Sequence, residues 1–138
     1  MYPEQLVTPM RAELVNAGFQ ELKDTTAVDA VLSNDKGTVL LMVNSVCGCA
    51  AGSARPGIVM SLQHDAKPDQ LVTVFAGMEP EAVKQARQYL LPYPPSSPAI
   101  ALFKDGKLVH IIERHHIEGK PAQMIAANLK AAFDEFCN

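Results

Sequence analysis

The sequence predicts a three-layer α/β/α domain in which helices cover both faces of a mixed four-stranded sheet, with additional helices before the first strand. Two short apolar runs, Val39–Val43 and Leu71–Ala76, have the composition of strands that are buried on both faces. A helical pattern follows each run. The pair Asp105-Gly106 then separates two further short apolar runs, which is typical of an antiparallel hairpin.

Length and composition exclude several classes of function. The 138 residues are about the size of one domain, so we expect residues 1–138 to form a single unit. The net charge of −3 provides no basic excess for binding nucleic acid or an anionic membrane. The chain has neither an apolar run of membrane-spanning length nor a signal-peptide pattern. We therefore expect a cytoplasmic protein with no nucleic-acid and no membrane partner.

Two helices are expected before the first strand. Thr8 and Pro9 are typical of the N-cap and first position of a helix, and Gly18 is typical of a helix end. Asp24 is suited to cap a second helix. Because no linker or repeat separates this part from the rest, we expect residues 1–36 to pack on the core as a helical extension.

The middle of the chain predicts alternating strands and helices. Val39–Val43 is too short for a helix and is expected to be a central parallel strand. Ala50–Gln63 is helical in pattern, with a kink at Pro56 because proline lacks an amide hydrogen. The strand Leu71–Ala76 precedes another helix, which begins near Pro80.

The last part of the chain changes direction. Four prolines between positions 91 and 98 exclude a helix or central strand there. Ala99–Phe103 and Leu108–Ile112 are expected to form the antiparallel hairpin, and Pro121–Phe136 has apolar residues at helical spacing. This order of strands and helices is that of the thioredoxin-like fold.

The candidate chemistry lies at Cys47-Gly48-Cys49, between the first buried strand and the first long helix. In open α/β sheets, ligands bind at this edge. The partial positive charge of a helix N-terminus favours thiolate over thiol and lowers the pKa of a cysteine there. Gly48 suits a disulfide that spans one residue, and such a ring is expected to be strained. The pattern predicts a redox-active pair rather than two inert buried cysteines.

Ser97-Pro98 is a second candidate feature. A proline that begins a strand after a proline-rich loop is a candidate for a cis peptide bond, although most bonds before proline are trans. In the thioredoxin topology this position faces the loop that contains Cys47 and Cys49, called the cysteine loop below.

Three segments together resemble the bacilliredoxin family, and the resemblance spans nearly the whole chain. They read Asn-Ser-Val-Cys-Gly-Cys-Ala at 44–50, Pro-Pro-Ser-Ser-Pro at 94–98 and Glu-Arg-His-His-Ile-Glu-Gly at 113–119. The resemblance implies a cytosolic, thioredoxin-like thiol–disulfide oxidoreductase that removes bacillithiol, a low-molecular-weight thiol, from mixed disulfides on other proteins. Weak disulfide isomerase activity is also associated with the family. The implied partners are S-thiolated client proteins and the small thiol as co-substrate, with no further cofactor.

The resemblance also implies a role for each site residue. Cys47 would be the attacking cysteine and Cys49 the resolving one. Pro98 would be the cis-proline that shapes the substrate groove, with Gly48 and Ser97 as further substrate-binding residues. The sequence departs from ordinary thioredoxins because it lacks Trp and has one residue, not two, between the cysteines. Strong general reductase activity is therefore not expected.

Two other classes of function remain open from the sequence. A metal or iron–sulfur carrier would use Cys47 and Cys49 with Cys137 or a histidine, and the pair His115 and His116 offers further ligands. The Cys-x-Cys spacing is tighter than in usual zinc sites, so we expect no metal. A plain binding module would need neither thiol, and its function would survive replacement of both cysteines. Cys137 is otherwise expected to be a bystander at a helix end.

Overall fold

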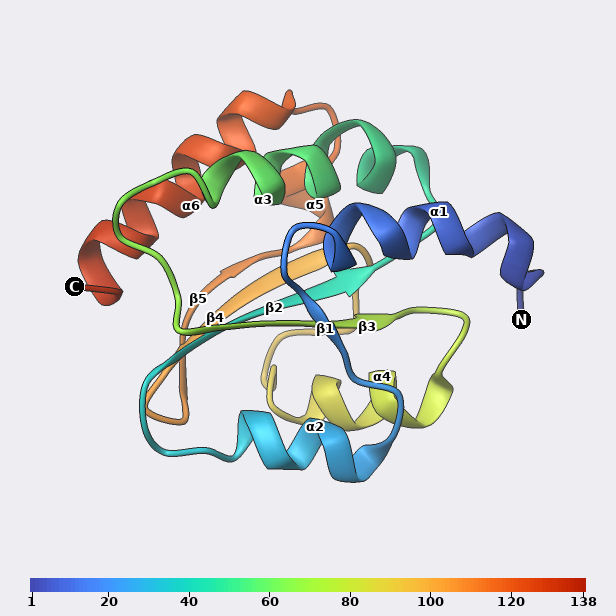
Figure 1. Ribbon diagram of the computed structural model, residues 1–138, viewed down its shortest axis with the longest axis horizontal. Helices are drawn as coiled ribbons and strands as arrows, with labels where there is room; N and C mark the ends of the chain where they lie inside the picture. Colours follow the sequence, from blue (N-terminus) through green and yellow to red (C-terminus); the bar gives the residue numbers. More distant parts are fainter.

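A five-stranded sheet forms the middle layer of the computed structural model, which describes residues 1–138 (Figure 1). The spatial order is β1-β3-β2-β4-β5, where the strands are β1 Gln20–Glu21, β2 Thr38–Asn44, β3 Gln70–Phe75, β4 Ala99–Lys104 and β5 Lys107–Ile112. β1, β3 and β2 run parallel, whereas β4 is antiparallel to β2 and β5 is antiparallel to β4. The prediction of a central strand is confirmed, because every residue of β2 is buried.

The sheet has one strand more than the four that the sequence predicts. β1 contains two residues, Gln20 and Glu21, which pair with Val72 and Thr73 of β3. Two residues are too few to show an alternating pattern, so their pairing depends on β3 rather than on a local signal. The prediction of four strands is therefore wrong, because it misses the edge strand β1. This strand joins the N-terminal part of the chain to the sheet.

Helices cover both faces of the sheet (Figure 1). They are α1 Glu4–Val15, α2 Thr25–Leu32, the π-helical turn η1 Ala50–Ala54, α3 Arg55–Ser61, α4 Pro80–Gln88, α5 Arg114–Ile117 and α6 Ala122–Phe136. Alternate residues of β2 point to opposite faces. Leu41 and Val43 pack in one core with α2 and α4, and Leu40 and Met42 pack in the other with α1, α3 and α6. No helix combines the length and the apolar character needed to cross a membrane.

The first helix begins earlier than expected. α1 starts at Glu4, so the prediction of a start at Thr8 and Pro9 is wrong, and Pro9 lies inside the helix. Pro9 removes the hydrogen bond that its own amide would make, and its ring crowds the carbonyl of Gln5. The helix continues through it because Val7, Arg11 and Leu14 are buried along one face.

The helix that follows the cysteines is interrupted before Pro56. η1 is a wide π-helical turn, and α3 begins at Arg55 with Pro56 in its first turn. Pro56 has no N–H to donate to the carbonyl of Gly52, and the wide turn replaces the regular ladder at this point. The sequence thus predicts an irregularity here, but the irregularity is a π-helical turn rather than a simple kink at Pro56.

Two local signals act as the sequence predicts. The Asp24 carboxylate caps α2 by accepting a hydrogen bond from the Ala27 N–H at 2.8 Å. Asp105 and Gly106 have φ angles of 52° and 81°, both positive as a type I′ turn between β4 and β5 requires.

Candidate active site

Cys47 and Cys49 lie at the carboxyl end of the central strand, where the chain enters a helical segment. β2 ends at Asn44, and the two residues after Cys47 are already helical. The N–H groups of Ala50 and Ala51 donate to the Cys47 carbonyl at 3.1 and 3.2 Å. Cys47 therefore occupies the N-terminal end of this segment, where the N–H groups of the first turn lack intrahelical partners.

The two thiols are free and in contact. Their Sγ atoms lie 2.7 Å apart, and both side chains are half-buried. Burial raises the pKa of Cys47, but hydrogen bonds from the Cys49 thiol, the Ala50 N–H, the Ser45 hydroxyl and the Cys49 N–H outweigh it and lower the pKa overall. The pKa of Cys49 is raised, first by burial and then by the hydrogen bond to Cys47 and its charge. This arrangement favours a thiolate on Cys47 and a protonated thiol on Cys49.

Gly48, between the cysteines, is exposed and is not in the left-handed region of backbone conformation. An added Cβ at Gly48 would meet nothing within 4 Å. The backbone freedom that the sequence analysis assigns to Gly48 is thus not used in this state, in which both thiols are free. The space beside Gly48 is open to solvent.

Ser97 and Pro98 lie at the same end of the sheet as the cysteine loop. The Ser97–Pro98 peptide bond is cis, and Pro98 is buried. The next residue, Ala99, pairs with Val43 near the end of β2. Arg114 connects this loop with α5, because its Nη1 donates to the Ser97 carbonyl at 3.2 Å. Its positive charge also lies close enough to interact with both cysteines.

A buried polar network lies directly before the cysteine loop. Nη1 of Arg55 donates to Asn44 Oδ1 at 3.0 Å and to the Ser45 carbonyl at 2.7 Å. The Cys47 N–H donates to Ser45 Oγ at 3.2 Å. Asn44 and Ser45 belong to the sequence segment that contains the cysteines, but no prediction from the sequence included Arg55. The available signal was an arginine three residues before the buried Ile58, because a charge on the apolar face of a helix needs partners.

The N-terminal helix also contributes to this region. The carbonyl of Met10 accepts a hydrogen bond from Asn44 Nδ2 at 3.3 Å. Glu13 Oε2 lies 3.1 Å from Arg55 Nε. Val46, in the cysteine loop, packs against a small apolar cluster that includes residues of α1. α1 therefore supports the cysteine loop in addition to covering the sheet.

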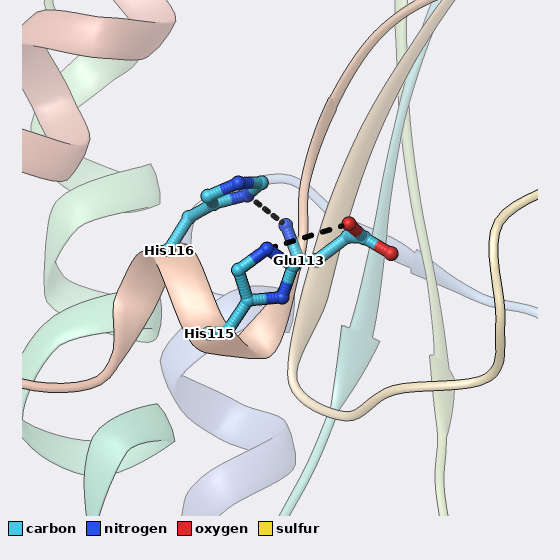
Figure 2. Close-up of side chains that lie close together, drawn as sticks. All are labelled: Glu113, His115 and His116. Atoms are coloured by element: carbon cyan, nitrogen blue, oxygen red, sulfur yellow. Dashed lines mark hydrogen bonds and ion pairs between the residues drawn. The ribbon is translucent and has the colours of Figure 1, made fainter.

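Glu113, His115 and His116 lie close together, and their ligand atoms all fall within 4.8 Å of one another (Figure 2). The Glu113 N–H donates to His116 Nδ1 at 3.1 Å. A neutral His116 ring with an acceptor at Nδ1 carries its hydrogen on Nε2, so neither nitrogen has a free lone pair for a metal. The Glu113 carboxylate in turn accepts from the His116 backbone N–H. These groups cap α5, and the cluster includes neither cysteine.

Cys137 lies far from the other two cysteines. It borders a hollow with Thr38 and Asp69, at the start of β2. Cys47 follows the opposite end of that strand, and the seven residues of β2 span roughly 20 Å. Cys137 therefore cannot complete a metal site with Cys47 and Cys49 or attack Cys47 within the same chain.

The cysteine pair lies outside the largest cavity. That cavity, of about 380 Å³, lies between β5, α5 and α6, and its walls include His115, His116 and Lys120 but no cysteine. None of the four hollows of the surface includes Cys47 or Cys49. The two half-buried cysteines thus border none of these hollows, whereas the space beside Gly48 between them is open.

The family model and the relatives found by comparison with known sequences agree on one family. A family model described as "Disulphide isomerase" matches residues 2–137. The chain is 63% identical over 135 residues to a bacilliredoxin of Cytophaga hutchinsonii, covering 98% of this chain and 99% of the relative. It is 52% identical over 136 residues to a bacilliredoxin of Halalkalibacterium halodurans, covering 99% of this chain and 94% of the relative.

Solved structures of thioredoxins have the same fold. Mitochondrial thioredoxin 3 from Saccharomyces cerevisiae aligns with a TM-score of 0.60 at 16% identity, over 90% of this chain and 99% of the thioredoxin. A mutant thioredoxin from Halobacterium salinarum aligns with a TM-score of 0.61 at 19% identity, over 88% of this chain and 93% of the thioredoxin. The predicted thioredoxin-like fold is confirmed.

Proposed function

Because this chain belongs to the bacilliredoxin family and is a thiol–disulfide oxidoreductase, we propose that it removes bacillithiol, or a similar low-molecular-weight thiol, from mixed disulfides on client proteins. The observation that carries the proposal is the pair of touching thiols at a helix N-terminus, one with a lowered and one with a raised pKa. One thiol is thereby suited to attack, and the other to remain protonated until the second step.

In the first step the Cys47 thiolate attacks the sulfur of the small thiol in the client mixed disulfide. A new disulfide forms between Cys47 and the small thiol, and the client leaves as a thiolate that takes up a proton from water. The N–H groups of Ala50 and Cys49 and the Ser45 hydroxyl stabilise the attacking thiolate. We place the client over the exposed Gly48, beside the loop that contains Ser97 and Pro98, as the family resemblance implies.

In the second step Cys49 loses its proton and attacks the Cys47 sulfur. The Cys47–Cys49 disulfide forms, and the small thiol leaves as a thiolate. The two protein sulfurs are already in contact, so the attacking sulfur is next to its target. The client is thereby reduced and the protein oxidised by two electrons, which a separate thiol must later return.

The same nucleophile supports a second, weaker activity on disulfides between two client cysteines. Cys47 attacks such a disulfide, and a different client thiol then attacks the mixed disulfide and releases Cys47 unchanged. This exchange isomerises client disulfides without net oxidation. The description of the matching family as a disulphide isomerase supports this activity.

Single-cysteine variants separate the two steps. A Cys49→Ala variant should accept one equivalent of bacillithiol and stop as a mixed disulfide on Cys47, and Cys47→Ala should accept none. Intact-mass spectrometry after incubation with a bacillithiolated client shows the mass added to each protein.

A Cys137→Ala variant is the matched control and should act like the parent protein, because Cys137 lies at the other end of β2. Transfer that persists in Cys47→Ala would refute Cys47 as the nucleophile. Function that survives replacement of both Cys47 and Cys49 would instead favour a plain binding module.

A further inference from the structure

Arg55 has the largest side chain that the fold buries completely, with 1% of the residue exposed. Removing a guanidinium group from water is costly unless it is paired and hydrogen-bonded. Its carboxylate neighbour Glu13 lies 3.1 Å from Nε, but the Nε hydrogen does not point at it, and 45% of the Glu13 side chain is exposed. An apolar side chain of similar volume would be less costly to bury. The ion pair alone therefore does not account for an arginine at this position.

The hydrogen bonds of the guanidinium go to a single turn. Nη1 donates to Asn44 Oδ1 and to the Ser45 carbonyl. Asn44 Oδ1 also accepts a hydrogen bond from the Ser45 N–H at 2.8 Å, so the Asn44 side chain is bonded to the backbone of the same turn. The guanidinium group is planar and holds its N–H groups in fixed directions. Arg55 thus fixes the path of the chain between the end of β2 and the cysteine loop.

The same turn holds the nucleophile. Ser45 Oγ accepts a hydrogen bond from the Cys47 N–H at 3.2 Å. Burial raises the pKa of Cys47, and the Ser45 hydroxyl is one of the donors that lower it. Arg55 makes no hydrogen bond to either cysteine, and hydrogen bonds rather than the Arg55 charge lower the pKa of Cys47. The contacts that join Arg55 to Cys47 run through the turn at Asn44 and Ser45, the Ser45 turn.

We propose that Arg55 is a positioning residue for Cys47, on which it acts by fixing the Ser45 turn, whose hydroxyl oxygen accepts the hydrogen bond from the Cys47 N–H. This inference rests on the proposed function only in taking Cys47 as the nucleophile. The inference assigns a role in the reaction to the buried cation on α3. It extends this role to α1, because Glu13 of α1 lies beside Arg55 and the Met10 carbonyl of α1 accepts from Asn44.

The test is the rate of Cys47 alkylation by iodoacetamide, followed by mass spectrometry of the Cys47 peptide from about pH 5 to 9. Arg55→Met keeps most of the side-chain volume and removes the donors. Its Cys47 should react about tenfold more slowly on the acid side of the profile, which corresponds to a rise of about one pKa unit. At high pH, where Cys47 is ionised in both proteins, the rate should match or exceed that of the parent.

A double-variant cycle tests the route through Ser45. Ser45→Ala alone should shift the profile in the same direction. Combined with Arg55→Met it should add little, because Arg55 acts through the same hydroxyl. Arg55→Lys keeps the charge but not the planar geometry. Compared with Arg55→Met, it should therefore regain more of the parent's melting temperature than of the parent's rate of Cys47 alkylation.

Arg11→Met is the matched control, because Arg11 is also a buried arginine but pairs with Glu21 and Glu79 instead. It should lower the melting temperature and leave the Cys47 profile unchanged. A folded Arg55→Met protein with the parental profile, or additive effects of Arg55→Met and Ser45→Ala, would overturn the inference. If neither Arg55 variant folds, a parental profile in Ser45→Ala would overturn it.

The alkylation assay contains neither a client nor a low-molecular-weight thiol. A failure of the inference in this assay therefore leaves the proposed function intact. A failure of thiol transfer in the mass-spectrometry assay would refute the proposed function and leave the link between Arg55 and Cys47 to be decided by alkylation.

Discussion

At the scale of single residues, the three cysteines have different environments although all are half-buried. The pKa of Cys47 is lowered, because hydrogen bonds to its sulfur outweigh the effect of burial. The pKa of Cys49 is raised by burial and by Cys47, and that of Cys137 is raised mainly by burial. The pKa of a cysteine is thus lowered at one position and raised at the other two, because each sulfur has different neighbours.

These differences predict the order in which the cysteines react. Near neutral pH, Cys47 should be alkylated first, with Cys49 and Cys137 reacting appreciably only as the pH rises past the ordinary range for thiols. Pulse labelling followed by peptide mapping measures the order. The protein unfolded in denaturant is the control, in which all three should label at similar rates. Labelling of Cys137 before Cys47 in the folded protein would contradict the argument.

At the scale of elements, the close packing of α3 against α6 fixes the position of the helix that follows the cysteines. A Cβ added at Gly57 would lie 2.7 Å from Ile125 Cβ and 2.9 Å from the Ala122 carbonyl. Neither α6 nor the backbone of α3 can move aside without cost. Glycine at this position therefore lets the two helices approach.

We expect Gly57→Ala to reduce the free energy of unfolding by about 1–3 kcal/mol, as overpacking in a core does. Denaturant unfolding measures the change. Gly52→Ala is the matched control on η1, because an added Cβ there meets nothing within 4 Å. It should alter stability by less than about 1 kcal/mol. Equal losses in the two variants would show that the approach of α3 to α6 is not the cause.

At the scale of the whole molecule, Arg11 connects elements from both sides of the sheet. Its guanidinium lies 2.8 Å from Glu21 of β1 and 2.6 Å from Glu79, which precedes α4. It also bonds Glu4 of its own helix at 2.9 Å and lies over the Phe75 ring. α1 packs on one face of the sheet and α4 on the other (Figure 1), so these contacts join the two outer layers around the sheet edge.

Arg11→Met should destabilise the protein by about 2–4 kcal/mol, because it leaves the partly buried Glu79 without a cation and Glu21 with only the exposed Lys23. Chemical unfolding gives the value. Glu4→Ala removes only an exposed partner, with 60% of its side chain accessible, and should cost less than about 1 kcal/mol. A loss in Arg11→Met no larger than that in Glu4→Ala would mean that this cluster does not hold the layers together.

Features that depend on neighbouring residues could be predicted from the amino-acid sequence. Apolar runs predicted the central strand and its partners, Asp105-Gly106 predicted the hairpin turn, and Asp24 predicted the cap of α2. The spacing of Cys47 and Cys49 after a buried strand predicted a pair at a helix N-terminus. Such signals can be read from the sequence because turns, caps and periodic burial are set within a few residues.

Features that depend on contacts between distant segments could not be predicted and are visible only in the folded chain. β1 exists because β3 offers it a pairing edge, and α1 continues through Pro9 because one of its faces is buried. The partners of Arg55 come from two separate segments, α1 and the turn at the end of β2, and Cys137 is separated from Cys47 by the length of β2. No local pattern encodes these relations, since the free energy of burying a strand edge, a helix face or a charge depends on what the rest of the chain brings against it.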